Sequence, residues 1–478
     1  MERRINMGKP TGFLEYERKN NQAVEPLERI KNFNEFHTPM REKDRREQAA
    51  RCMNCGVPFC QSGMMIGGMA SGCPLNNLVP EWNDLLYHGN YKKALQMLRQ
   101  TNNFPEFTSR VCPALCEAAC TCGLNDTPVT CKANENAIIE YGYANELMGA
   151  QPPKTRTGKK VAVIGSGPSG LTCAGDLAKL GYDVTVFEAL HEIGGVLKYG
   201  IPEFRLPNKI VDVEIDNLGK MGVNFIKDCI VGKTIGVEDL KAEGFKGIFV
   251  ASGAGLPNFM NIPGENSINI MSSNEYLTRV NLMDAASEDS DTPVAFGKNV
   301  AVIGGGNTAM DSVRTARRLG AERAMIVYRR SEEEMPARLE EVKHAKEEGC
   351  EFITLTNPVE YIADERGRVK QVRVQKMALG EPDASGRRSP VPIPGATETI
   401  DIDLAIVSVG VSPNPIVPSS IKGLELGRKG TIAVNDNMQS SIPTIFAGGD
   451  IVRGGATVIL AMGDGRKAAA AMNEQLKK

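Results

Sequence analysis

The sequence predicts an α/β protein in which one βαβ unit is inserted into another, behind a helical N-terminal region rich in cysteine. Three observations carry this prediction. A strand, a glycine-rich turn and a helix follow one another at residues 160–188 and again at 299–330. Near the C-terminus, "TIFAGGD" (444–450) has the pattern of a strand that returns to the first unit. Nine of the twelve cysteines fall within the first 131 residues.

The composition is that of an ordinary globular protein, with 478 residues, 41% hydrophobic and 24% charged. At about 150 residues per domain we expect three domains. A net charge of −2 gives no reason to expect nucleic acid or a membrane surface as a partner. The charged start "MERRINMGKP" is unlike a signal peptide, and no segment has the roughly 18 apolar residues of a membrane span. We therefore expect a cytoplasmic protein, where clustered cysteines indicate metal or redox chemistry rather than disulfides.

Residues 1–150 are expected to form a helical domain, because "WNDLLYHGNYKKALQMLRQTN" (82–102) carries apolar residues at helical spacing. The basic segment "AQPPKTRTGKK" (150–160) is typical of a linker. The first βαβ domain is expected over 158–292 and 413–478, and the inserted one over 293–412. The acidic segment "MDAASEDSDTP" (283–293) marks the boundary between them. The four histidines are too scattered to suggest a histidine-rich metal site.

The first turn, "GSGPSG", is a G-x-G-x-x-G motif of Gly165, Gly167 and Gly170 directly after the strand "VAVI". The first glycine permits the tight turn, the second lets the backbone approach a pyrophosphate, and the third lets the helix pack on the strand. The helix N-terminus directs a partial positive charge at that anion. Glu188 ends the next strand, 18 residues after Gly170, where an acid accepts hydrogen bonds from a ribose. The motif predicts a dinucleotide site.

The second turn has the related pattern G-x-G-x-x-A, formed by Gly304, Gly306 and Ala309. The strand that follows it ends in "VYRR", so Arg329 and Arg330 stand where an NAD site has an acid. An acid would repel a 2′-phosphate, whereas guanidinium groups bind one bidentately. We expect this site to prefer NADP(H); the alternative is a pair of solvated arginines.

Two nested dinucleotide folds in one chain suggest a flavin together with a nicotinamide nucleotide. The segment "IFAGGD" supports this interpretation, because it would bring Asp450 to the ribityl and phosphate groups of the flavin. The helix that begins near Thr457 would direct its N-terminus at the flavin ring. The predicted fold class is therefore α/β, with two nested Rossmann-like, glutathione-reductase-like domains preceded by an α-helical iron–sulfur domain.

The iron–sulfur part of this prediction depends on two groups of cysteines, Cys52, Cys55, Cys60 and Cys73, and then Cys112, Cys116 and Cys120. Short spacings with Cys-Pro pairs resemble thiolate binding of cubane iron–sulfur clusters. Zinc is the main alternative, but four-thiolate zinc sites usually have paired C-x2-C units, and this chain has one. A flavin favours iron–sulfur, because it splits a hydride into single electrons that clusters carry. Spacing leaves Cys122 and Cys131 undecided; Cys173, Cys229 and Cys350 are expected to be structural.

Over essentially its whole length the chain resembles the small (beta) subunit of bacterial NADPH-dependent glutamate synthases. The resemblance lies in the cysteine groups, "GSGPSG", "GGVLKYGIPEFRLP" (194–207), "GGGNTAMD" (304–311), "YRRSEEEMPAR" (328–338) and "AGGDIVRGGATVILAMGDGRKAA" (447–469). The cofactor core also resembles the N-terminal half of dihydropyrimidine dehydrogenase and the large subunit of electron-bifurcating ferredoxin:NADP oxidoreductases. The segment "MGKPTGFLEYER" (7–18) favours the first of the three.

The resemblance implies two [4Fe–4S] clusters with interleaved ligands. One set is Cys52, Cys55, Cys60 and Cys120; the other is Cys73, Cys112, Cys116 and a non-cysteine ligand, for which the matching position is Glu135. Cys131 lies four residues earlier and would share a helix face with Glu135, so it is the alternative fourth ligand. We favour Glu135. The segment "QSGMMIGGMASG" (61–72) has the character of a loop insertion.

The resemblance also implies the residues that contact the two nucleotides. Those for FAD are Gly165, Ser166, Gly167, Pro168, Ser169, Gly170, Glu188, Gly195, Val196, Arg205, Gly449, Asp450 and Thr457. Those for NADPH are Gly304, Gly306, Asn307, Thr308, Arg329, Arg330 and Arg338.

The implied function is electron input. NADPH reduces FAD without a catalytic side chain, and the clusters pass electrons to the large (alpha) glutamate synthase subunit, which makes glutamate from glutamine and 2-oxoglutarate. The alternative is the bifurcating ferredoxin:NADP oxidoreductase. A disulfide reductase is rejected, because Cys229 is the only cysteine between Glu188 and the second turn. The intact glycine turns argue against a regulatory subunit without turnover.

Overall fold

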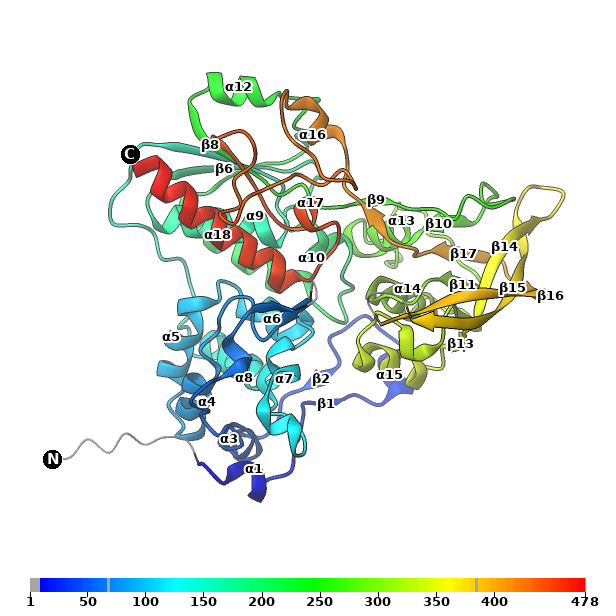
Figure 1. Ribbon diagram of the computed structural model, residues 1–478, viewed down its shortest axis with the longest axis horizontal. Coiled ribbons are helices and arrows are strands. Elements are labelled where there is room, and N and C mark those ends of the chain that lie inside the picture. Colours follow the sequence, from blue (N-terminus) through cyan, green and yellow to red (C-terminus); the bar gives the residue numbers. More distant parts are fainter. Residues whose placement is uncertain (1–8, 67–68, 383–385, 478) are drawn as a thin grey trace.

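The computed structural model describes residues 9–66, 69–382 and 386–477. Its N-terminal part is helical, as the sequence predicts (Figure 1). The helices are α3 (Glu42–Ala50), α4 (Val79–Tyr87), α5 (Tyr91–Thr101), α6 (Pro105–Val111), α7 (Leu115–Ala118) and α8 (Cys131–Ala144). Asn90 caps α5 by accepting a hydrogen bond from the Lys93 amide, and the helices bury Trp82, Leu86 and Ile138 between them. Smaller elements are α1 (Gly12–Glu15), η1 (Phe59–Gln61), β3 (Met64–Ile66), β4 (Met69–Ser71) and η2 (Thr121–Leu124).

The first nucleotide domain contains a parallel five-stranded sheet in the order β19-β8-β5-β6-β7. The strands are β5 (Lys160–Ile164), β6 (Asp183–Phe187), β7 (Asn224–Ile226), β8 (Phe245–Val250) and β19 (Ile445–Ala447). The C-terminal strand thus returns to the first unit, as "TIFAGGD" predicts. Helix α9 (Pro168–Lys179) packs against the C-terminal helix α18 (Val458–Lys477) beside the sheet. The remaining helices are α10 (Val196–Tyr199), α11 (Asn208–Lys220), α12 (Val237–Ala242), α16 (Ile416–Ser420) and α17 (Asp450–Arg453).

The second nucleotide domain is also built on a parallel five-stranded sheet, in the order β10-β17-β11-β12-β13. The strands are β10 (Ile270–Ser272), β11 (Asn299–Ile303), β12 (Arg323–Val327), β13 (Glu351–Ile353) and β17 (Leu404–Val407). Its helical elements are α13 (Ser273–Leu277), η3 (Thr278–Leu282), α14 (Asn307–Arg318), η4 (Glu332–Glu334) and α15 (Leu339–Glu347).

The expected boundary at 292/293 is displaced in the structure. Strand β10 and helix α13 precede it, yet β10 pairs with β17 of the second sheet. The chain crosses between the domains earlier, at the antiparallel pair of β9 (Leu256–Pro257) and β18 (Val411–Ser412). The acidic segment 283–293 is therefore a loop within the second domain, because polar composition marks a surface loop and not only a linker.

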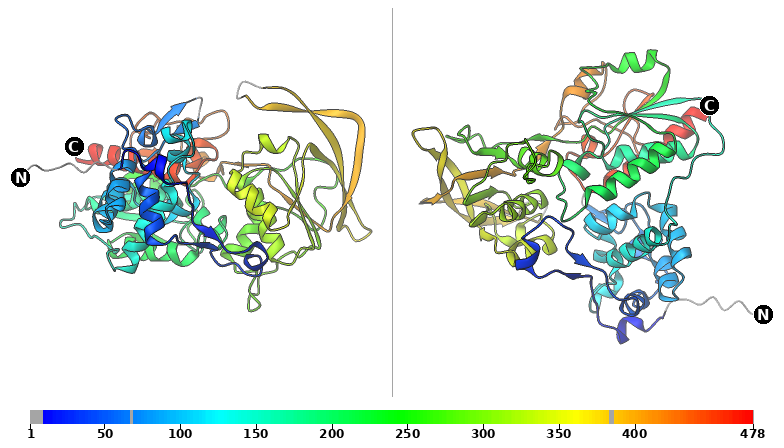
Figure 2. Two further views of the ribbon diagram at one scale, coloured as in Figure 1. Left: turned by 90° about the horizontal axis from the view of Figure 1, so that it is seen from below. Right: turned by 180° about the vertical axis from the view of Figure 1, so that it is seen from behind.

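A three-stranded antiparallel sheet extends from the second nucleotide domain. Its strands are β14 (Thr356–Ala363), β15 (Val369–Pro382) and β16 (Arg388–Asp401). Figure 2 (left) shows the long pair β15 and β16 rising from the domain and curving back over it. The pairing shifts register between Gln375 and Met377, and such irregularities bend a strand pair.

An N-terminal strap, residues 20–40, crosses from the helical domain to the second nucleotide domain (Figure 1). It contains β1 (Gln22–Ala23), α2 (Pro26–Arg29) and β2 (His37–Thr38). Arg29, only 2% exposed, reaches Glu348 at 2.7 Å. Arg314 and Arg318 also pair with Glu348, at 2.9 and 2.7 Å. This buried network fastens the strap to α14 and to the end of α15.

Candidate functional site

The first glycine-rich turn joins β5 to α9, and its three glycines have three different surroundings. Gly165 has φ +100°, and a Cβ there would lie 2.5 Å from the Ala251 carbonyl oxygen. A Cβ on Gly170 would lie 2.1 Å from the Gly165 oxygen. A Cβ on Gly167 would meet nothing within 4 Å, so this glycine faces open space. These are the turn, packing and ligand-approach positions of a dinucleotide motif.

Glu188 lies against this turn. One of its carboxylate oxygens accepts hydrogen bonds from the Ser166 amide at 2.9 Å and the Ser166 hydroxyl at 2.5 Å; the other accepts from the Leu190 amide at 2.9 Å. The segment at the start of α10 joins them, because the Gly194 amide donates to Ser166 Oγ and a Cβ on Gly195 would lie 2.9 Å from Gly167 Cα. The structure therefore gathers the turn, Glu188, Gly195 and Val196.

The C-terminal return segment reaches the same turn. Gly449 has φ +78°, and a Cβ on it would lie 3.0 Å from Ser169 Cβ, the residue that follows Pro168 on α9. Asp450 accepts a hydrogen bond from the Ala456 amide at 2.9 Å, and burial raises the pKa of its carboxyl. Thr457 Oγ1 accepts from the Leu460 amide at 3.4 Å and caps α18.

The second turn repeats the pattern between β11 and α14. Gly304 has φ +148° and approaches the Ser408 carbonyl oxygen, whereas a Cβ on Gly306 would meet nothing within 4 Å. Asn307 and Thr308 begin α14, and Asn307 Oδ1 accepts a hydrogen bond from the Arg338 amide at 2.9 Å. This brings the start of α15 to the turn.

The expected phosphate-binding arginines follow β12. Arg329 is exposed, and among the described residues its side chain has no hydrogen bond or ion pair. Arg330 Nε donates to the Arg388 carbonyl oxygen at 2.9 Å. The guanidinium of Arg338 pairs with Glu340 at 2.6 Å, so its charge is already balanced.

Arg205, which the resemblance assigns to the flavin, pairs with acids of the second nucleotide domain. Its guanidinium donates to both carboxylate oxygens of Asp311, at 2.9 and 2.8 Å, and lies 3.2 Å from Glu341. Asp311 and Glu341 are on α14 and α15. Arg205 therefore joins the two nucleotide domains, a partnership across 106 positions that its local motif does not reveal.

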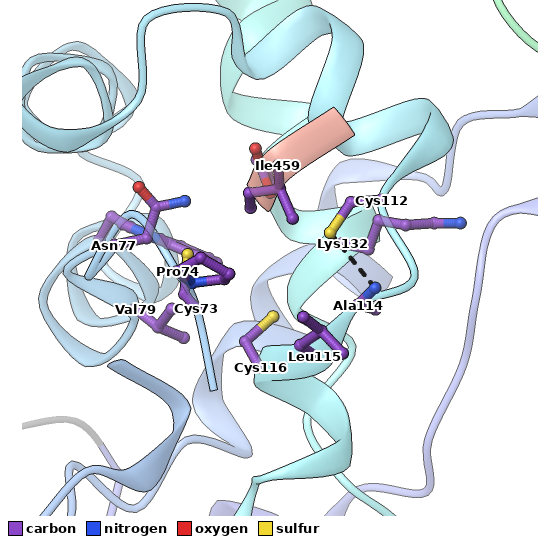
Figure 3. Close-up of a pocket in the computed structure, with 12 residues that line it drawn as sticks. Cys73, Pro74, Asn77, Val79, Cys112, Ala114, Leu115, Cys116, Lys132 and Ile459 are labelled. Atoms are coloured by element: carbon purple, nitrogen blue, oxygen red, sulfur yellow. Dashed lines mark hydrogen bonds between the residues drawn. The ribbon is translucent and has the colours of Figure 1, made fainter. Parts of the chain in front are cut away.

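The cysteines of the helical domain line two adjacent cavities. One is lined by Cys52, Cys55, Cys60, Cys120, Cys122 and Cys131. The other is lined by Cys73, Cys112, Cys116 and Glu135. Figure 3 shows the sulfur atoms of Cys73, Cys112 and Cys116 directed toward a common space. Val79 lines both cavities, and Ile459 of α18 lines the second, so the second cavity lies where the helical domain meets the first nucleotide domain.

Glu135 and Cys131 are both on α8, one turn apart, and line different cavities. Glu135 lines the second cavity, and its Oε1 accepts hydrogen bonds from Asn102 at 2.9 Å and Thr108 at 2.5 Å. Burial raises the pKa of Glu135 to about 7. Cys131 lines the first cavity. The Cys131 thiol also forms a hydrogen bond with Cys116, which lines the second cavity. The choice of Glu135 over Cys131 as fourth ligand therefore stays a prediction.

The electrostatics of both cavities suit a bound cation. Burial raises the pKa of the Cys52 and Cys112 thiols to about 12, so these groups ionise at neutral pH only when a positive charge is present. A hydrogen bond from Cys122 lowers the pKa of Cys120 to about 6. Clustered soft thiolates fit iron–sulfur chemistry.

One further group of possible metal ligands, His37, Glu340 and His344, occurs among the described residues, with ligand atoms within 4.8 Å of one another. Histidines that are scattered in the sequence thus meet in the fold, because the strap lies on α15. Glu340 is already paired with Arg338 at 2.6 Å and with Lys132 at 3.2 Å. These two cations already balance its carboxylate.

Two nested dinucleotide folds with an adjoining cysteine domain define a pyridine-nucleotide oxidoreductase with an iron–sulfur module. A family model for pyridine nucleotide-disulphide oxidoreductases matches residues 130–241 and 159–465, and one for the 4Fe-4S cluster domain II of dihydropyrimidine dehydrogenase matches residues 29–147. In spite of the first family's name, Cys173 and Cys229 are buried in separate cores. None of the described helices combines the length and apolarity needed to cross a membrane.

The chain belongs to the glutamate synthase small-chain family. It is 36% identical to the glutamate synthase [NADPH] small chain of Bacillus subtilis, over 98% of this chain and 99% of that one. It is 35% identical to the corresponding chain of Mycobacterium tuberculosis, over 98% and 96%. Among solved structures, FprA of M. tuberculosis superposes with a TM-score of 0.57 at 19% identity, over 67% of this chain and 85% of that chain, which confirms the predicted fold.

Proposed function

We propose that this chain is the electron-input subunit of a glutamate synthase, with NADPH at the second turn, FAD at the first and two [4Fe–4S] clusters in the cysteine cavities. The observation that carries the proposal is that Ile459, a residue of the first nucleotide domain, lines the second cysteine cavity. This residue is in the first turn of α18, the helix whose N-terminus faces the flavin fold, and it also lines the second cavity. A flavin converts a hydride into single electrons that clusters accept.

In this scheme the residues of the chain bind the two nucleotides and orient them. The open faces of Gly167 and Gly306 admit the two pyrophosphates, and α9 and α14 direct their N-termini at them. Glu188 offers its carboxylate to the flavin ribose. The Arg205–Asp311 pair holds the two nucleotide domains in one orientation. Hydride transfer needs placement of the two rings and no acid or base from the protein.

The position of the cavities suggests the order of transfer. The second cavity, proposed to hold a cluster on Cys73, Cys112, Cys116 and Glu135, adjoins the flavin domain. The first cavity, proposed to hold a cluster on Cys52, Cys55, Cys60 and Cys120, is lined by the half-exposed Phe59. Electrons would therefore pass from the flavin to the second cavity, then to the first, and leave near Phe59.

A large partner subunit is part of the proposal. The chain is 34% identical to glutamate synthase [NADH] of Saccharomyces cerevisiae over 98% of its own length but only 22% of that protein. The same unit is thus one portion of a much longer chain there, which supports a large partner supplied here in trans. A cytoplasmic setting is part of the proposal as well. The names of the relatives include both NADPH and NADH, so the coenzyme proposal depends on Arg329 and Arg330.

The test measures the iron, sulfide and FAD content of the chain, purified without oxygen, together with its NADPH-dependent activity. We expect about eight iron and eight acid-labile sulfide per FAD, and reduction of a dye by NADPH. Stoichiometric zinc without sulfide would contradict the cluster proposal. Mass spectrometry of the protein that co-purifies from native cells identifies the partner; recovery of a ferredoxin-linked assembly in place of a large glutamate synthase subunit would contradict the proposed pathway.

A further inference from the structure

The start of β16 lies against the residues that follow the expected phosphate-binding arginines. Arg388 Nε pairs with Glu334 at 2.7 Å, and its Nη2 lies 3.2 Å from Glu333. The Arg388 carbonyl oxygen accepts the hydrogen bond from Arg330 Nε at 2.9 Å. Arg387, next to it, donates to the Tyr328 hydroxyl and to the Glu334 carbonyl, both at 3.1 Å. The curved strand pair thus contacts the segment after β12, with Arg388 lying 54 positions from Glu334 and 58 from Arg330.

The acids that pair with Arg388 would weaken phosphate binding if their carboxylates were free. Glu333 and Glu334 follow Arg330 by three and four positions in the same short segment. A 2′-phosphate carries close to two negative charges. Carboxylates free to pair with the two arginines would compete with that phosphate and repel it. Glu334 is held by Arg388 and by the Ser331 hydroxyl, and its side chain is only 8% exposed.

We propose that Arg388 is a positioning residue for coenzyme selectivity: it binds the Glu333 and Glu334 carboxylates and thereby leaves Arg329 and Arg330 available to a 2′-phosphate. This inference rests on the proposed preference for NADPH. It locates part of that preference on the β15–β16 strand pair, outside the βαβ unit whose motif predicts the coenzyme. Arg388 itself need not touch the nucleotide.

The experiment measures the dissociation constants of NADP⁺ and NAD⁺ by calorimetry, on the intact protein and without turnover. Arg388→Gln should weaken NADP⁺ binding about tenfold and change NAD⁺ binding less than about twofold. The backbone hydrogen bond to Arg330 survives this substitution, so the charge alone is tested. Arg373→Gln is the matched control, because Arg373 pairs with Glu360 on the same antiparallel sheet and has no contact with Glu333 or Glu334 among the described residues.

A second variant separates the charge effect from a folding defect. If the released carboxylates cause the loss, Arg388→Gln combined with Glu333→Gln and Glu334→Gln should restore the NADP⁺-to-NAD⁺ ratio to within about threefold of the unmodified protein. An unchanged ratio in Arg388→Gln, equal losses for both nucleotides, or no restoration in the triple variant would overturn the inference. Tighter binding of NAD⁺ by the unmodified protein would instead overturn the proposed coenzyme.

Discussion

Asp311→Ala is predicted to weaken both the stability of the protein and the placement of its two nucleotide domains. The substitution removes both hydrogen bonds, of 2.9 and 2.8 Å, that the buried Arg205 makes to this carboxylate. Among the residues that the structure describes, Glu341 at 3.2 Å then remains as the one acid paired with Arg205. Removing one partner of a buried ion pair costs about 3–5 kcal/mol, because the other charge stays out of water. For a domain of this size the unfolding temperature should fall by about 10 °C.

The assay has two readouts. Calorimetry of the variant reports the loss of stability. Stopped-flow reduction of the flavin at saturating NADPH reports the placement of the nicotinamide, and we expect it to slow by a factor on the order of 10 to 100, since a displacement of about 1 Å has such an effect. The control is Glu351→Ala, which breaks the exposed 2.8 Å pair with Arg323 in the same domain and should change stability by less than about 1 kcal/mol.

The reasoning would be refuted if Asp311→Ala and Glu351→Ala lowered the unfolding temperature equally, or if Asp311→Ala left flavin reduction unchanged. In the first case the buried pair would contribute no more than an exposed one. In the second, the two domains would keep their orientation without the Arg205–Asp311 pair, and Arg205 would be available for the flavin contact that the family resemblance implies.

Further predictions concern the nucleotide, the clusters and the strap. Arg329→Ala with Arg330→Ala should weaken NADPH binding by about 3–5 kcal/mol and NADH binding little, because each charge-assisted hydrogen bond contributes about 1.5–3 kcal/mol; equal losses of kcat/KM for both nucleotides would show that the arginines do not contact a phosphate. Glu135→Ala should remove or alter the paramagnetic signal of one cluster, whereas Cys131→Ser should not; the reverse result would make Cys131 the ligand. Cys52→Ser should lower the iron content by about half and leave NADPH-dependent dye reduction largely intact, and loss of dye reduction would contradict direct hydride transfer to FAD. Burial lowers the pKa of His37 and of His344 to about 4, so protonation between pH 6.5 and 4 favours the unfolded chain and the unfolding temperature should fall there. His344→Gln should lessen that fall, and an identical pH profile would exclude the pair as its cause.

The sequence predicts the parts of this structure that local chemistry dictates. The glycine turns and their strands follow from backbone rules that act within about 30 residues. The return of residues 444–450, where Ile445 pairs with Ile248, is predicted instead from the nested order of the two dinucleotide units. The boundary at 292/293 fails, because a three-residue strand such as β10 carries too little pattern to show which sheet it joins.

Side-chain partners that are far apart in the sequence escape prediction for a different reason. Arg205 meets Asp311, and Arg388 meets Glu334, only after the domains and the curved strand pair have assembled. The motif around Arg205 contains no information about α14, so it does not predict the pair with Asp311. The contact between His37 and His344 is not predictable from the sequence for the same reason, because it depends on the course of the strap.

The lining of the second cavity has a consequence for how the protein is made. Its cysteines are synthesised well before Ile459, which closes one side and follows Cys116 by 343 positions. At about 5–20 residues per second, Cys73, Cys112 and Cys116 wait on the order of tens of seconds before their site has all its walls. During that interval the thiols are open to oxidation and to the wrong metal. Delivery of iron and sulfide should therefore be timed after α18 has been synthesised, and a chain truncated before α18 should lack the cluster proposed for this cavity although its proposed ligands are present.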